Sequence, residues 1–83
     1  MAIKRCIISE KSEGERGAEN LVREARRYDG EISISKNNRI ANAKSMIGIL
    51  GLELKSGDEV VVDVYEDIPN DTYVLNSFLE TAI

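Results

Sequence analysis

The chain has 83 residues, and its eleven Lys and Arg against fifteen Asp and Glu give a net charge of −4. This length fits one small domain, and the acidic balance argues against nucleic acid as a direct partner because phosphate contacts require a basic surface. The sequence contains no histidine, which excludes histidine acid–base catalysis, phosphorylation on histidine and metal ligation by histidine.

Apolar runs and cysteine usage predict a cytoplasmic protein. No apolar run approaches the roughly 18 residues of a membrane-spanning helix, and the opening MAIKRCIIS lacks the long apolar region of a signal peptide. The single cysteine, Cys6, cannot form an internal disulfide, and its place in the run CII predicts a small buried side chain. We therefore expect a reduced, cytoplasmic setting and no membrane partner.

The first third of the chain predicts a strand, a loop and a helix. Residues 2–9 are rich in β-branched side chains and alternate around Cys6 and Ile8, which favours a strand. The polar segment 10–17, EKSEGERG, contains two glycines and predicts a loop. From Gly17 onwards, apolar residues recur with helical spacing. This stripe consists of Ala18, Leu21, Val22, Ala25 and Tyr28.

The middle of the chain predicts a β-hairpin. Residues 31–36, EISISK, place Ile32 and Ile34 on one face and polar side chains on the other, which is the pattern of a half-buried strand. The pair Asn37-Asn38 favours a turn because asparagine tolerates positive φ. Residues 39–42 then return as a short antiparallel strand.

The last part predicts a short apolar segment headed by Ser45, a strand and a closing helix. The run EVVVDVY, residues 59–65, is the strongest strand signal and indicates a central strand. Pro69 favours a helix start. The expected helical face carries Tyr73, Val74, Ser77, Phe78 and Ala82. The order β, α, β, β, short α, β, α indicates an α+β domain with a largely antiparallel sheet and helices on one face.

The segment NAKSMIGILGLELKSGDEVVV, residues 42–62, resembles the HPr family, the histidine-containing phosphocarriers of the bacterial sugar phosphotransferase system, and its regulatory relative Crh. With the flanking strand and the final helix, the resemblance covers nearly the whole chain. It implies that residues 1–83 form one HPr-like domain. It also implies an open-faced β-sandwich, in which three helices cover one face of a four-stranded, mostly antiparallel sheet.

The resemblance implies that Ser45 is the serine phosphorylated by a regulatory kinase. Elementary chemistry is compatible with this role, since a serine ahead of a helix accepts a hydrogen bond from first-turn amides. A phosphate there would bring about −1.5 to −2 charges to the positive end of the helix. The alternative is that Ser45 is an unmodified helix cap.

Five apolar residues follow Ser45 in a segment too short to hide them on one stripe, so some of them face solvent. In HPr-like proteins an exposed apolar patch at this place docks partner proteins. By resemblance we assign docking to Met46, Ile47 and Leu50 and a core position to Ile49 and Leu52. The alternative for the first three residues is ordinary core packing.

The family's phosphorylated histidine belongs to a G-x-H-A-R-P pattern at the start of the first helix, where this chain reads SEGERGAEN. The histidine position falls on Gly14 or on Glu15, depending on register. Neither residue can relay phosphate as an imidazole does, although a carboxylate such as Glu15 can in principle form an acyl phosphate. Arg16 matches the family's arginine, and Gly17 replaces its proline. We therefore expect no catalytic residue and no phosphoryl relay.

The remaining features resemble Crh, which lacks the histidine and keeps the serine. Crh-like proteins are phosphorylated by HPr kinase and act as corepressors of a LacI-type repressor in carbon catabolite regulation. This implies an HPr-type serine kinase and a LacI-type transcriptional repressor as partners. Arg16, Arg23 and Arg26 or Arg27 would lie on the contacting face. The alternative for the helical arginines is that they lie on a solvent-exposed helix face and pair with Glu19 and Glu24.

No residues suggest an enzyme, because no nucleophile–base pair and no phosphate-cradling loop is present. Glu10, Glu13 and Glu15 lack the regular spacing of a calcium loop, so we expect neither a metal nor a cofactor. An alternative function is a diverged HPr-like domain that is never phosphorylated and acts as a constitutive protein-interaction module. The oligomeric state stays open between a monomer and a weak dimer.

Overall fold

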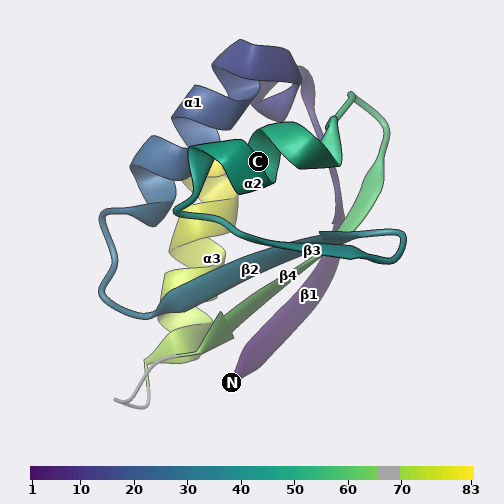
Figure 1. Ribbon diagram of the computed structural model, residues 1–83. Helices are drawn as coiled ribbons and strands as arrows, with labels where there is room; N and C mark the ends of the chain where they lie inside the picture. Colours follow the sequence, from purple (N-terminus) through teal and green to yellow (C-terminus); the bar gives the residue numbers. More distant parts are fainter. Residues whose placement is uncertain (66–69) are drawn as a thin grey trace.

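The computed structural model describes residues 1–65 and 70–83, which form one antiparallel sheet with helices on one face (Figure 1). The strands are β1 Ala2–Ile7, β2 Glu31–Lys36, β3 Arg39–Asn42 and β4 Glu59–Tyr65. The helices are the 3-10 turn η1 Glu10–Ser12, α1 Gly14–Ala25, α2 Met46–Leu52 and α3 Asp71–Ala82. The sheet order is β1-β4-β2-β3, and each neighbouring pair is antiparallel. This is the predicted α+β open-faced sandwich.

Strand β4 lies in the interior of the sheet, between β1 and β2, as its run of valines predicts. Val60, Val62 and Val64 point toward the helices and are fully buried. Val61 and Asp63, on the opposite face, remain partly exposed because no helix covers that side. Successive residues of β4 therefore alternate between the core and the surface.

The predicted hairpin is confirmed. Lys36 and Arg39 pair across the end of β2 and β3, so that the turn consists of the two residues between them. Asn37 has a φ of 56°, in the left-handed region that asparagine tolerates better than most residues.

Helix α1 begins at Gly14, three residues earlier than predicted, and a tight contact explains the difference. A Cβ atom on Gly17 would lie 2.0 Å from the carbonyl carbon of Ser12, so Gly17 is the point where α1 crosses η1. Gly17 is therefore a packing residue inside the helix and not its start. The helix ends at Ala25, and Tyr28, beyond it, is half-buried with its hydroxyl 2.8 Å from the Ser77 Oγ.

Two predictions about buried residues need correction. Tyr73 is 69% exposed, and Leu75 instead lies on the buried face of α3, because Leu75 is about one helical turn from the buried Phe78 whereas Tyr73 is not. Cys6 is only half-buried because β1 is an edge strand, and this partial burial raises the pKa of its thiol. The predicted helix start at Pro69 lies outside the described residues, and α3 begins at Asp71.

The Gly17 contact predicts a specific sensitivity. We expect Gly17→Ala to lower the free energy of unfolding by about 3 kcal/mol, because the methyl group must push apart two backbones. Gly51→Ala is the matched control in α2, where a Cβ meets nothing within 4 Å and should stabilise the helix by up to about 1 kcal/mol. Urea unfolding measures both changes, and equal stability of the two variants would contradict this account.

Candidate phosphorylation and docking site

Ser45 is the N-cap of α2. Its backbone is extended, with φ −104° and ψ 112°, and its Oγ accepts a hydrogen bond from the Gly48 N–H at 3.1 Å. Its carbonyl oxygen accepts the first helical hydrogen bond, from the Ile49 N–H at 3.0 Å. The predicted capping role is confirmed, and the side chain remains partly exposed while it caps.

The apolar residues of α2 divide between the core and the surface. Ile49 and Leu52 are buried, as predicted. Ile47 is 85% exposed, Leu50 is 41% exposed, and Met46 is half-buried against the edge of the core. We call Met46, Ile47 and Leu50 the docking surface. Core packing therefore does not account for Ile47 or Leu50, and it accounts only in part for Met46.

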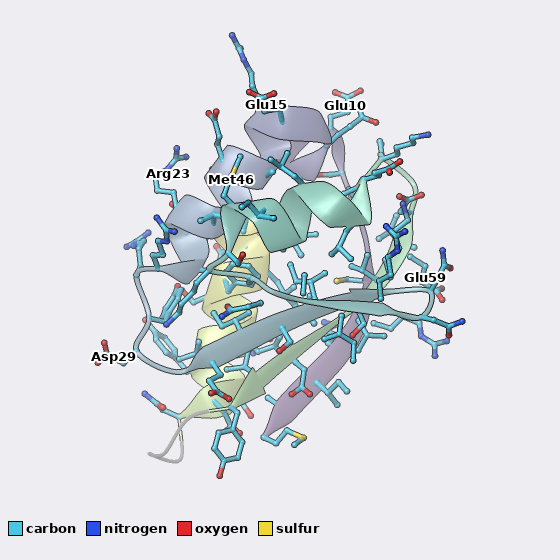
Figure 2. All side chains as sticks on the ribbon, in the orientation of Figure 1. Glu10, Glu15, Arg23, Asp29, Met46 and Glu59 are labelled. Atoms are coloured by element: carbon cyan, nitrogen blue, oxygen red, sulfur yellow. The ribbon has the colours of Figure 1, made fainter. Side chains whose placement is uncertain are left out.

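A pocket of about 200 Å³ lies between the start of α1 and helix α2. Its wall contains both residues that compete for the family's histidine position, Gly14 and Glu15, together with Leu50 of the docking surface. Gly14 has a φ of 70°, and its N–H donates to the Leu54 carbonyl at 3.2 Å. Glu15 is exposed at the end of α1 (Figure 2). The pocket thus lies between the two candidate histidine positions and Leu50, and it offers no imidazole.

The arginines of α1 and of the two residues that follow it divide into two groups. Arg23 donates to the Asn20 Oδ1 at 2.6 Å and lies 3.8 Å from the Glu24 carboxylate, which Arg27 also contacts at 3.0 Å. These contacts agree with a solvated helix face, although Glu19 takes no part in an ion pair among the described residues. Arg23 nevertheless lies on the same side of the molecule as Met46 on α2, a helix in contact with α1 (Figure 2).

Arg26 has a different role, which the sequence did not reveal. Its Nε and Nη2 donate to the Lys44 carbonyl at 3.2 and 3.0 Å, directly before Ser45. The Lys44 Nζ in turn donates to the Tyr28 carbonyl at 2.5 Å. These bonds fix the turn that presents Ser45 against the end of α1. Both acceptors are backbone carbonyls brought close only by folding, so no sequence pattern signals them.

Arg16, the remaining predicted contact residue, is exposed in the first turn of α1. It shares this end of the helix with Gly14 and Glu15, whereas Arg23 and Arg26 lie two and three turns further along. The structure therefore spreads the predicted basic residues from the start of α1 to its C-cap and gathers only Ser45, Met46, Ile47 and Leu50 at one place.

This geometry defines a small open-faced β-sandwich with a capped, accessible serine at the head of an exposed apolar helix. A sequence model described as PTS HPr component phosphorylation site matches residues 6–71. The chain belongs to the HPr family of the phosphotransferase system. Proteins of this family are phosphocarriers, not catalytic enzymes.

Solved structures show the same architecture. The phosphocarrier protein HPr from Bacillus anthracis str. Ames is 27% identical, with a TM-score of 0.84 over 99% of this chain and 96% of that one. HPr from Thermoanaerobacter tengcongensis shares the fold at 23% identity, with a TM-score of 0.83 over 99% and 91%. The Bacillus subtilis catabolite repression protein Crh is 25% identical, with a TM-score of 0.72 over 83% and 77%. In residues 1–65 and 70–83, no helix has the length and apolarity needed to cross a membrane.

The cap geometry predicts the effect of removing the Ser45 hydroxyl. We expect Ser45→Ala to lower the free energy of unfolding by about 1 kcal/mol, since the Gly48 amide loses its acceptor. Ser45→Asn keeps a side-chain oxygen at the cap and should retain most of that stability. Both are measured by chemical denaturation. An equal loss in the two variants would show that the cap bond does not hold α2.

Proposed function

We propose that this protein is a cytoplasmic regulator of the HPr family that docks onto partner proteins and is switched by phosphorylation at Ser45. The observation that carries the proposal is the position of a partly exposed serine directly before an exposed apolar surface, in a chain that has no histidine. A phosphoryl relay through an imidazole is impossible for this sequence. What the family site retains is the serine and the docking surface.

Phosphorylation at Ser45 would add charge without unfolding α2. The Oγ already faces the amide of Gly48, and an anion is stabilised at the amino end of a helix. The phosphate would bring about −1.5 to −2 charges beside Met46 and Ile47. A partner that matches this surface carries arginine or lysine next to an apolar patch, because phosphate and guanidinium form strong charge-assisted hydrogen bonds.

The proposed partners are an HPr-type serine kinase, which would phosphorylate Ser45, and a LacI-type transcriptional repressor, which would bind the phosphorylated protein. Support comes from the similarity to Crh, which is described as a catabolite repression protein. The protein would then be a non-enzymatic corepressor in carbon catabolite regulation that contacts the repressor and not DNA. Its net charge of −4 favours this arrangement, since the chain itself would be repelled by DNA.

The decisive experiment compares two phosphoryl donors. The purified protein is incubated with an HPr-type kinase and ATP, and separately with phosphoenolpyruvate and the general phosphotransferase enzyme, and intact mass is read in both. We expect one phosphate from the kinase alone, and none on Ser45→Ala. Phosphate from phosphoenolpyruvate would contradict the loss of the relay. No phosphate in either reaction would favour the constitutive interaction module instead.

The docking surface predicts that an exposed residue can be changed so that binding weakens while the fold stays intact. We expect Ile47→Asp to weaken binding of the Ser45-phosphorylated protein to a LacI-type repressor at least tenfold, because a buried apolar anchor typically contributes more than about 1.4 kcal/mol. The variant should fold normally, since Ile47 is exposed. Tyr73→Asp, an exposed apolar residue on α3, is the control and should bind like the unaltered protein. Titration calorimetry measures both, and equal affinities would contradict the assignment.

A further inference from the structure

Two basic side chains next to Ser45 have no carboxylate partner. Arg26 and Lys44 take part in no ion pair among the residues that the structure describes. Both donate instead to backbone carbonyls, which leaves their charge uncompensated. Arg27, by contrast, lies 3.0 Å from the Glu24 carboxylate. The end of α1 and the turn before α2 therefore bring uncompensated positive charge to the serine from two different elements.

The Arg26 guanidinium is held close to Ser45 by the Lys44 carbonyl oxygen. Its Nη2 donates to this oxygen at 3.0 Å, and its Nε donates at 3.2 Å. Because a peptide unit is planar, the oxygen lies within about 3 Å of the Ser45 Cα, so the Arg26 Nη2 lies within about 6 Å of that Cα. A guanidinium carries more N–H donors than this carbonyl engages, and the side chain is exposed. Donors therefore remain free for an anion at residue 45.

We propose that Arg26 binds a phosphate on Ser45 of the same chain, so that phosphorylation ties the start of α2 to the end of α1. The inference rests on the proposed function, because its ligand is phosphoserine at residue 45. Arginine and phosphate form charge-assisted hydrogen bonds that are often bidentate. The seryl phosphate and the arginine side chain close the remaining distance by rotation about their own side-chain bonds. Lys44 adds positive charge from the adjacent residue.

This contact changes what a partner meets at the docking surface. The phosphate is already held in one place beside Met46, which lowers the entropic cost of binding it. The nearby guanidinium favours the doubly charged phosphate and lowers its second pKa from the ordinary value of about 6. The stabilisation is therefore fully present above about pH 6 and is lost as the pH falls through the lowered pKa.

The test uses the full chain with phosphoserine built into residue 45 by chemical synthesis, which is practicable for 83 residues. No kinase is needed, so a failed kinase reaction would contradict the proposed function and leave this test intact. The melting temperature is measured with and without the phosphate in the unaltered chain and in Arg26→Gln. Glutamine keeps an N–H donor for the Lys44 carbonyl and removes the charge. Arg27→Gln is the matched control, since it removes the same charge from the next residue, which pairs with Glu24.

We expect the phosphate to raise the melting temperature of the unaltered chain by about 4 °C or more, and that of Arg26→Gln by less than half as much. Arg27→Gln should show the full rise. The difference between the two rises excludes the support that Arg26 gives to the unmodified turn, because that support is common to both forms.

A titration followed by phosphorus NMR gives a second measurement, which a purely structural role of Arg26 would not change. The second pKa of the phosphate should be lower by about 0.5 in the unaltered chain than in Arg26→Gln. Equal rises in melting temperature, or equal pKa values, in these two chains overturn the proposal. A reduction of the same size in Arg27→Gln also overturns it, because the effect would then come from the general charge of the helix end.

Discussion

The contact between Gly17 and the backbone of Ser12 is the constraint on which the helical layer depends. It presses α1 onto η1, and η1 in turn holds the end of α3, because the Ser12 Oγ donates to the Ala82 carbonyl and the Ser9 Oγ donates to the Ile83 carbonyl at 2.5 Å. Three segments far apart in the sequence thus meet where α1 begins. Ser12 also lines the pocket beside α2, so the segment that Gly17 packs against forms part of the wall of that pocket.

The short length of α2 explains how one segment serves both the core and a partner. Seven residues make about two turns, so that Ile49 and Leu52 are buried in the core and Met46 packs against its edge. Ile47 and Leu50 consequently face outward, where they belong to the surface that we propose docks a partner. The Ser45 cap stabilises the first turn, and the Arg26 contact to the Lys44 carbonyl fixes the chain before it. The contacts that fix this segment therefore lie at Ser45, the proposed phosphorylation site, and just before it, and not among the exposed apolar residues.

The two ends of α1 contribute differently to the candidate site. At the amino end, Gly14 has a φ of 70° and Glu15 is exposed, and neither residue offers an imidazole nucleophile. At the carboxyl end, Arg26 supports Ser45 through the backbone of Lys44.

The sequence by itself determined the order of the elements, the central place of β4, the turn at Asn37 and the capping role of Ser45, because each depends on residues that are neighbours along the chain. Only the tertiary structure decided where α1 begins, that Leu75 and not Tyr73 is buried, that Cys6 lies on a half-exposed edge, and that Arg26 supports the turn before Ser45. The reason is physical. Periodicity and caps act over one or two turns, whereas a glycine contact, an edge position or a bond to a distant carbonyl exists only when remote segments pack together.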